Sequence, residues 1–260
     1  MRANHTAVAV IPITVVPAAS NRTATVERLP TPCSACGLRG VCLPCGLSAA
    51  DASSVDGLVY SRRRVRRHET LYRSGTPFKA LYAVRSGFLK SYVVTDDGRE
   101  QVTGFQMPGE IVGLDGIDNE THRLNVEALE DTVVCVIPYA RLEQMAGRFP
   151  ALQRQIHRMM SREIVRDQGV MTLLGTMDAE QRVVAFLLSL SQRFAARGYA
   201  AAEFLLRMTR EEIGSYLGLK LETVSRVFSR LQQAGLIAVQ NKNVQLHDLP
   251  ALKAVLGRAA

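Results

Sequence analysis

The sequence lacks long apolar runs, and it lacks the motifs of the common catalytic sites. No window offers the uninterrupted apolar stretch of about 18 residues that a bilayer-spanning helix needs, so we expect no integral membrane protein. No Walker loop, HExxH motif or Ser/His/Asp set occurs, and the five histidines are scattered along the chain. The sequence therefore predicts a protein that is not an enzyme.

The sequence also lacks the even number of cysteines that a complete disulfide framework requires. The chain has five cysteines, and four of them form two CxxC pairs within residues 33–45. An odd count with this spacing is typical of a metal site in a cytoplasmic protein rather than of disulfides in a secreted one. Pro12 and Pro17 interrupt the apolar run near the N-terminus, which favours a disordered leader over a secretory signal.

The composition that is present is that of a globular protein with an excess of basic residues. Apolar residues make up 47% and charged residues 22% of the 260 positions, a length that suits two domains of roughly 100 to 150 residues each. The net charge of +8 favours an acidic partner such as nucleic acid. Residues 68–150 carry 8 basic and 12 acidic side chains, whereas residues 177–260 carry 11 and 7. The C-terminal part is therefore the better candidate for a polyanion-binding surface.

Short apolar segments separated by turn residues dominate the first half of the chain. Regular short strands with such turns predict an antiparallel sandwich, roll or barrel. A short helix is expected before them at 48–60, and the arginine run at 62–67 is interpreted as a solvated strand edge without a site. The expected strands cover residues 81–84, 88–94, 102–105 and 133–137.

One long helix is predicted after the strands, from Phe149 to Gly175. Its residues repeat at alternating spacings of three and four, which is typical of a coiled-coil seam that pairs with a second helix, although a core face within one chain is the alternative. Asp167 is out of place in this stripe, because two carboxylates brought together in a symmetric pair repel each other. The stripe consists of His157, Met160, Ile164, Asp167, Met171 and Leu174.

The C-terminal part has the pattern of a winged helix-turn-helix. Thr209 and Glu212 form a capping box that begins one helix, and Gly218 ends it. The remaining expected elements are a helix at 178–197, a helix at 220–234, and two strands at 236–239 and 244–246 around a turn.

Three polar residues share the exposed side of the helix at 220–234. Glu222, Ser225 and Arg226 have the spacing i, i+3 and i+4, so their side chains project together from the half of the helix that enters the major groove of DNA. Arg pairs with guanine, Glu accepts from cytosine, and Ser can bond to bases or phosphates. A surface salt bridge between Glu222 and Arg226 is the alternative interpretation.

Within the CxxC segment, soft thiolates favour zinc or an iron–sulfur cluster. Zinc bound by the four N-terminal cysteines is the simplest interpretation from the residues alone. The five residues between the pairs make a tight loop for a structural zinc module, however, and Cys135 would then be an unrelated buried thiol.

The chain resembles the CRP/FNR transcription regulators, and within them the oxygen-sensing FNR branch. The strings that carry the resemblance, which spans about residues 33–247, lie at 81–87, 90–92, 103–105, 208–219 and 222–226. This resemblance implies an α+β fold. Its parts are an N-terminal antiparallel β-roll like that of cyclic-nucleotide-binding domains, a long dimerisation helix and a C-terminal winged helix-turn-helix. We expect a disordered leader at 1–32, a cysteine segment at 33–47, a β-roll sensor domain at 48–148, the dimerisation helix at 149–175 and the DNA-binding domain at 176–260.

The resemblance also implies a cofactor. In the FNR branch, three cysteines spaced C-x2-C-x5-C and one distant cysteine hold a 4Fe-4S cluster, and Cys33, Cys36, Cys42 and Cys135 match these positions. Cys45 is then an extra thiol, and an exchange of the fourth ligand stays open. Cyclic-nucleotide members hold a phosphate with Gly-Glu and a later Arg-Ser pair. Here Gly109 and Glu110 are present, but the later position reads His-Arg-Leu, so Glu110 is expected in an ordinary turn.

The function implied is that of an oxygen-responsive regulator in the cytoplasm. It would assemble its cluster without oxygen, form a homodimer through Met160, Ile164, Asp167 and Met171, bind palindromic DNA with TTGAT-like half-sites, and contact RNA polymerase. Oxygen would dismantle the cluster. Three rivals remain at this point: a zinc-stabilised DNA-binding protein, a cyclic-nucleotide-responsive relative, and a redox enzyme domain that uses CxxC thiols.

Overall fold

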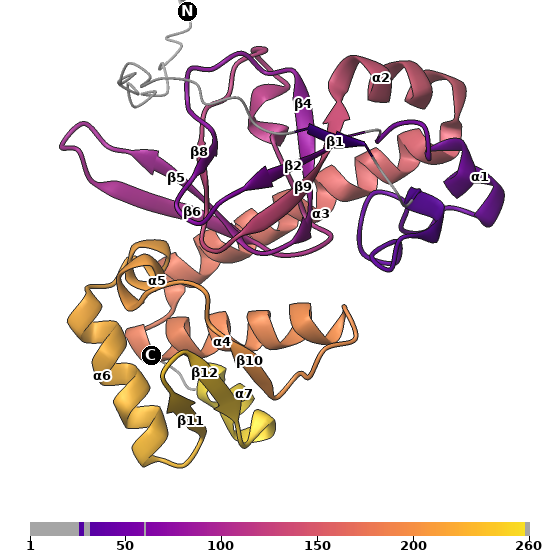
Figure 1. Ribbon diagram of the computed structural model, residues 1–260. Helices are drawn as coiled ribbons and strands as arrows, with labels where there is room; N and C mark the ends of the chain where they lie inside the picture. Colours follow the sequence, from indigo (N-terminus) through magenta and orange to yellow (C-terminus); the bar gives the residue numbers. More distant parts are fainter. Residues whose placement is uncertain (1–25, 29–31, 60, 258–260) are drawn as a thin grey trace, which may run out of the picture.

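The N-terminal domain is a roll of two antiparallel sheets. The computed structural model describes residues 26–28, 32–59 and 61–257 (Figure 1). One sheet has the order β1-β2-β9-β4-β7 and the other β3-β8-β5-β6, which confirms the predicted antiparallel roll. The strands are β1 (Val26–Arg28), β2 (Ser61–Val65), β3 (Thr70–Tyr72), β4 (Ala80–Ser86), β5 (Leu89–Val94), β6 (Glu100–Gln106), β7 (Ile111–Val112), β8 (Asn125–Ala128) and β9 (Thr132–Pro138).

The segment before the roll is more ordered than the sequence suggests. Val26–Arg28, within the expected disordered leader, pairs with β2 as strand β1, while residues 1–25 and 29–31 lie outside the described part of the chain. A 3-10 helix, η1 (Cys33–Ala35), begins the cysteine segment, and helix α1 (Ala49–Ser54) follows it. The Ser48 hydroxyl caps α1 by accepting from the backbone N–H of Asp51 at 3.1 Å. The helix ends earlier than predicted, because the chain turns so that Val55 and Leu58 enter the core.

Two helices follow the roll. Helix α2 (Tyr139–Arg148) was not predicted, and α3 (Pro150–Thr176) confirms the long helix. Pro150 begins α3 in the first turn, where proline removes no helical hydrogen bond. Ile164 and Met171 of the predicted stripe are 56% and 64% exposed, so the stripe is not a core face within one chain. No helix in the described residues is both long and apolar enough to cross a membrane.

The C-terminal domain is a winged helix-turn-helix. The capping box is confirmed, with Glu212 N–H donating to the Thr209 hydroxyl at 3.1 Å and Thr209 N–H donating to the Glu212 carboxylate at 2.7 Å. Gly218 ends the helix with a φ of 63°. The elements are α4 (Ala179–Ala195), β10 (Glu203–Leu205), α5 (Arg210–Leu217), α6 (Leu221–Gln233), β11 (Ile237–Gln240), β12 (Asn243–Leu246) and α7 (Leu249–Leu256); β10 and α7 were not predicted.

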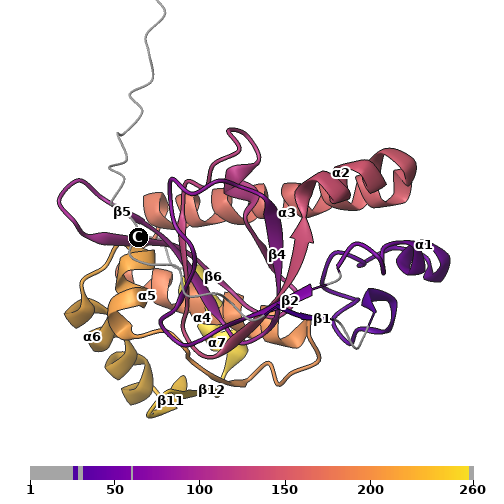
Figure 2. The same ribbon diagram turned by 45° about the horizontal axis from the view of Figure 1, so that its top comes forward.

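The two domains pack closely on each other. Figures 1 and 2 show α5 beside the hairpin of β5 and β6. The Lys90 ammonium of β5 pairs with the Glu212 carboxylate at 3.2 Å, and the Ser215 hydroxyl donates to the Glu100 carbonyl at 2.9 Å. One continuous apolar core includes Phe105 of β6 and Leu187 of α4. The first helix of the helix-turn-helix is therefore held directly against the sensor roll.

Candidate functional site

Four of the five cysteines line one cavity. Cys33, Cys36 and Cys42 come from the loop around η1, and Cys135 reaches the same cavity from strand β9. The cavity is small, with a volume of about 30 Å³, and it is partly open to solvent. All five thiols are free, and Cys45 does not line the cavity. The structure thus brings together, from two distant parts of the chain, the four cysteines that the family resemblance implies as ligands.

The cysteine loop, residues 33–47, is held in place by hydrogen bonds to Asp56 and by apolar packing of Leu43. The Asp56 carboxylate, just beyond α1, accepts from the Ser34 backbone N–H at 2.7 Å and from the Ser34 hydroxyl at 2.6 Å. Leu43 is 3% exposed in a core that also contains Ile137 of β9 and Leu152 of α3. The loop therefore rests on the sensor sheet and on the start of the long helix together.

The thiols lie in a desolvated environment that carries positive charge. Burial raises the pKa of Cys33 to about 11 and that of Cys42 to about 12, so both are protonated thiols at neutral pH without a metal. Burial also raises the pKa of Cys135, although the hydrogen-bonding Arg62 guanidinium partly offsets this. The Arg85 guanidinium donates to Cys36 Sγ at 3.1 Å. These cations face the position where bound thiolates would add negative charge.

The prediction that the arginine run at 62–67 is a strand edge without a site is wrong for Arg62, which lies beside Cys135. Strand β2 is not an edge, because it lies between β1 and β9 in the sheet. Arg62 is the direct register partner of Cys135 across the β2–β9 pair. Residues on adjacent strands that are directly opposite interact on the same face, which brings Arg62 to the thiol. No local motif in the sequence identifies this pairing.

The donor set around the cavity consists of four thiols, a set that suits either zinc or an iron–sulfur cluster. In residues 26–28, 32–59 and 61–257, no group of three or more His, Cys, Asp or Glu side chains is gathered closely enough to hold one metal ion. The four cysteines nevertheless surround one cavity. A 4Fe-4S cluster binds each thiolate on a separate iron, so its ligands lie farther apart than the four ligands of zinc.

The helix α6 presents the three predicted DNA-reading residues on its outer side. Glu222, Ser225 and Arg226 are all exposed. In the part of the chain that the structure describes, no ion pair joins Glu222 to Arg226, and the Arg226 guanidinium donates instead to the Thr223 hydroxyl at 3.3 Å. On the opposite side of α6, Phe228 packs against α5. The Arg210 guanidinium carbon of α5 lies 3.3 Å from the centroid of the Phe228 ring. The exposed triad therefore sits on a helix fixed within the helix-turn-helix.

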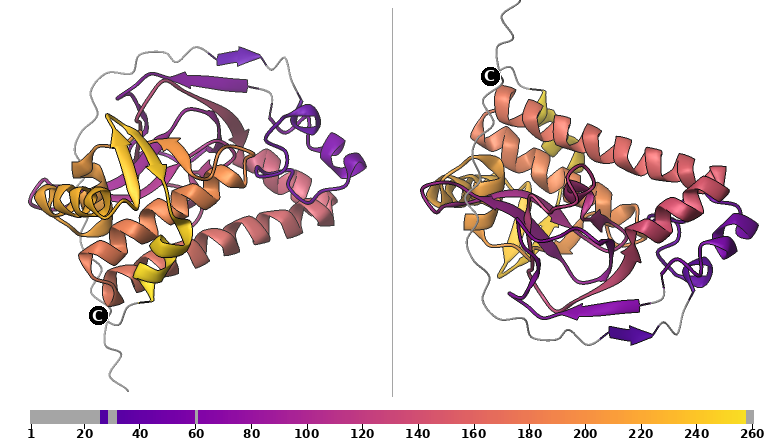
Figure 3. Two further views of the ribbon diagram at one scale, coloured as in Figure 1. Left: turned by 90° about the horizontal axis from the view of Figure 1, so that it is seen from below. Right: turned by 90° about the horizontal axis from the view of Figure 1, so that it is seen from above.

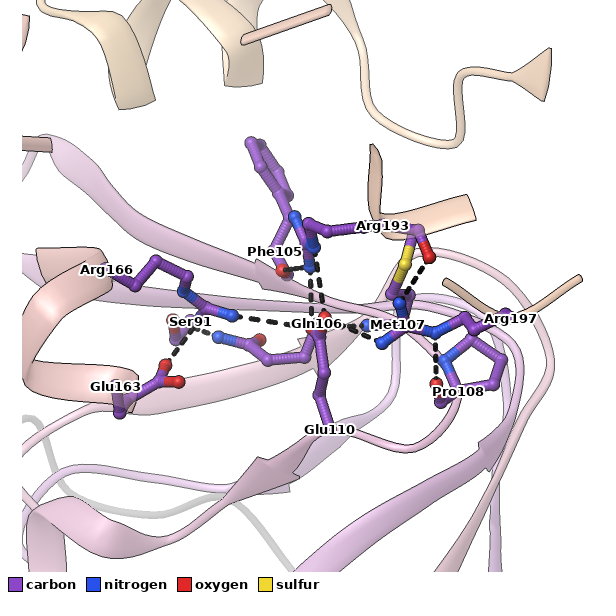
Figure 4. Close-up of polar contacts among 10 residues, drawn as sticks. All are labelled: Ser91, Phe105, Gln106, Met107, Pro108, Glu110, Glu163, Arg166, Arg193 and Arg197. Carbon is purple, nitrogen blue, oxygen red and sulfur yellow. Dashed lines mark hydrogen bonds and ion pairs between the residues drawn. The ribbon is translucent and has the colours of Figure 1, made fainter. Parts of the chain in front are cut away.

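Glu110 lies in the predicted turn between β6 and β7, but its side chain makes contacts that the prediction of an ordinary turn did not include. Its side chain is only 17% exposed and is surrounded by three arginines, as Figure 4 shows. The carboxylate accepts from Arg193, in the last turn of α4, at 2.6 Å and from Arg197, two residues beyond that helix, at 2.8 Å. It also pairs with Arg166 of α3 at 3.5 Å. Burial alone would raise the pKa of Glu110, but the arginines bring it below its usual value. The sequence missed this cluster because its members are far apart along the chain.

The stripe on α3 is open to solvent in the single chain. Ile164, Asp167 and Met171 are exposed, Met160 is half-buried, and His157 is exposed near the start of the helix. This leaves an apolar surface with a carboxylate in its middle, which can be covered by a second copy of the helix.

Comparisons with known proteins agree with both domains. Residues 62–149 match the family of cyclic nucleotide-binding domains, and residues 181–255 match the family of Crp-like helix-turn-helix domains. The chain is 50% identical to the transcriptional regulatory protein btr of Bordetella pertussis, over 87% of this chain and 93% of that protein. It is 48% identical to the transcriptional activator protein anr of Pseudomonas aeruginosa, over 86% of this chain and 92% of that protein.

A more distant regulator and a solved structure are also similar. The fumarate and nitrate reduction regulatory protein of Salmonella typhimurium is 40% identical over 86% of this chain and 90% of its own length. The structure of FixK2 from Bradyrhizobium japonicum superposes with a TM-score of 0.70 at 34% identity, over 76% of this chain and 98% of that chain.

Proposed function

Because the chain belongs to the CRP/FNR family of transcription regulators, and is therefore a DNA-binding regulator, we propose that it senses oxygen through a 4Fe-4S cluster held by Cys33, Cys36, Cys42 and Cys135. The observation that carries the proposal is the convergence of these four thiols on one cavity from two separate segments. Relatives whose names describe anaerobic regulation support it. When bound, the cluster would supply the chemistry that reacts with oxygen.

The chain's own residues account for binding and positioning. The four thiols would bind iron after losing their protons, and Arg62 and Arg85 would offset the negative charge that results. The core around Leu43 and Ile137 excludes water from the inner side of the cavity. Because Cys135 belongs to β9 and the others belong to the loop, ligand binding would fasten the loop to the sensor sheet.

We also propose how the regulator acts on DNA. Regulators of this family act as dimers, and the stripe of Met160, Ile164, Asp167 and Met171 is proposed as the contact between two copies. Glu222, Ser225 and Arg226 would read palindromic TTGAT-like half-sites in the major groove. Contact with RNA polymerase would complete transcription activation.

The test is purification without oxygen, followed by assays for iron, sulfide and zinc and by an absorption spectrum. We expect iron and sulfide in equal amounts and a broad visible absorption that air removes. Zinc without iron would contradict the proposal and favour a zinc-stabilised regulator. Titration with cyclic nucleotides and a thiol-exchange assay test the remaining two rivals.

Arg226→Ala is expected to weaken binding selectively at one base pair of each half-site. Loss of a bidentate contact to guanine should cost about 1–3 kcal/mol there and relax discrimination. The measurement is the affinity for a set of duplexes with every base at each position. Arg230→Ala is the control, because Arg230 lies one turn later on α6, is exposed and pairs with Glu180. An equal loss on all duplexes for Arg226→Ala would make Arg226 a phosphate contact.

A further inference from the structure

The cysteine site and the DNA-reading helix lie at opposite ends of the molecule. In Figures 1, 2 and 3 the segment around α1 is at one end and α6 is at the other. A change at the cysteines therefore cannot reach α6 by direct contact. The turn that contains Gly109 and Glu110, between β6 and β7, is in contact with structures on both sides.

On one side, this turn supports the cysteine loop. An ideal Cβ atom placed on Gly109 would lie 2.6 Å from Cγ2 of Val41, so Val41 rests directly on the glycine. Val41 is the residue before Cys42. Gly109 has a φ of 91°, a conformation that disfavours any side chain at this contact.

The same turn is bonded to the strand that contacts another cysteine. Gly109 N–H donates to the Val84 carbonyl at 2.7 Å, and Val84 N–H donates to the Glu110 carbonyl at 2.8 Å. The next residue of β4 is Arg85, whose guanidinium donates to Cys36 Sγ. The turn is thus connected to the cysteine loop by a packing contact and by the backbone of β4.

On the other side, the Glu110 side chain holds the C-terminal domain and the long helix. Arg197, only 5% exposed, and Arg193 bring the end of α4 to the carboxylate, and Arg166 brings α3. Arg193 also donates to the Phe105 carbonyl at 2.6 Å, and Arg197 donates to the Pro108 carbonyl. Figure 4 shows these side chains converging from separate elements on one carboxylate. Without that carboxylate, three guanidinium groups would face one another in a partly buried site.

We propose that Glu110 is the positioning residue that couples the cysteine loop to the DNA-binding domain. It acts through Arg193 and Arg197 to set the position of α4, and with it the helix-turn-helix, relative to the turn on which Val41 rests. A displacement of the cysteine loop would shift this turn and change the geometry of the arginine cluster. The coupling rests on the proposed function of the cysteine site, whereas the role of Glu110 in orienting the DNA-binding domain does not.

The test compares Glu110→Gln with Asp118→Asn. Both variants remove one negative charge from the sensor roll, but Asp118 pairs only with the exposed Arg123 and neighbouring Asn119 in the described chain. Each protein is purified without oxygen, and its iron and sulfide content and its affinity for a TTGAT-palindrome duplex are measured at a concentration where the wild type is dimeric. We expect both variants to retain the cluster. Glu110→Gln should bind the duplex at least about fivefold more weakly, within the range typical of coupled sites, and Asp118→Asn should match the wild type.

Two outcomes for Glu110→Gln would overturn the proposal: an affinity equal to that of Asp118→Asn, or a loss of iron together with DNA binding, which would assign Glu110 to cluster assembly. If Glu110→Gln does not fold, the Val41→Ala variant tests the coupling instead. This substitution leaves the cysteine ligands and the arginine cluster in place. It should reduce the gain in affinity that cluster loading produces, and an unchanged gain would refute the coupling. A wild type that contains no cluster would contradict the proposed function, while the comparison of the two variants' DNA affinities would still decide the role of Glu110.

Discussion

Replacing Cys135 by serine is expected to abolish the iron–sulfur absorption of protein purified without oxygen. A hydroxyl is a poor ligand for a soft metal, and Cys135 is the only cysteine that reaches the cavity from β9. The same loss is expected for serine at Cys33, Cys36 or Cys42. Serine is close in size to cysteine and Cys135 is only half-buried, so the roll should keep its fold, which circular dichroism can check.

Cys45→Ser is the matched control for this experiment. Cys45 lies in the same loop as three of the proposed ligands but does not line the cavity, so its variant should retain the absorption and the iron content. The reverse result, with the cluster retained in Cys135→Ser and lost in Cys45→Ser, would mean that the N-terminal segment binds metal alone. The contact between loop and sheet would then have no part in sensing.

Asp167→Ala is expected to give a dimer that persists in air. Asp167 is exposed in the middle of the α3 stripe, between the exposed apolar residues Ile164 and Met171. In a symmetric pair of helices its carboxylate would approach the partner's copy, and the repulsion would keep association weak until the cluster shifts the balance. Alanine removes the charge and is the strongest helix former. Sedimentation of the wild type and the variant, with and without oxygen, measures the effect.

Gln168→Ala is the control for Asp167→Ala. It changes the next exposed residue of α3, which is outside the stripe, and it alters no charge. We expect it to behave as the wild type, monomeric in air and dimeric without oxygen. An Asp167→Ala protein that stays monomeric in air, or a wild type that is already fully dimeric there, would remove Asp167 from the switching mechanism.

Elements with strong local patterns were predicted well from the sequence. The capping box of Thr209 and Glu212 is formed by residues three positions apart, so it is visible without knowledge of the fold. The four expected strands of the roll correspond to β4, β5, β6 and β9, because turn residues separate them. Helix α2 was missed because it follows directly on Pro138 and β9, with no capping side chain to mark its start.

Contacts between distant segments could not be derived from local patterns. Arg62 appears in the sequence as one of several arginines in a strand, and only the pairing of β2 with β9 brings it to Cys135. Glu110 is separated from Arg193 and Arg197 by 83 and 87 residues. The four cysteines were the exception, because the resemblance to a family supplied their grouping and the structure places them around one cavity.

The continuous apolar core between the domains has a consequence for cooperativity. Phe105 and Met107 of the roll share this core with Leu187 and Leu190 of α4, so neither domain retains its full packing when the other unfolds. The chain should therefore melt as one thermodynamic unit rather than as two. A cavity created at Leu187 would lower the free energy of unfolding of the sensor roll as well as that of the helix-turn-helix. Loss of DNA binding in such a core variant would then report global stability, and only substitutions on exposed positions of α6 would report on DNA contacts.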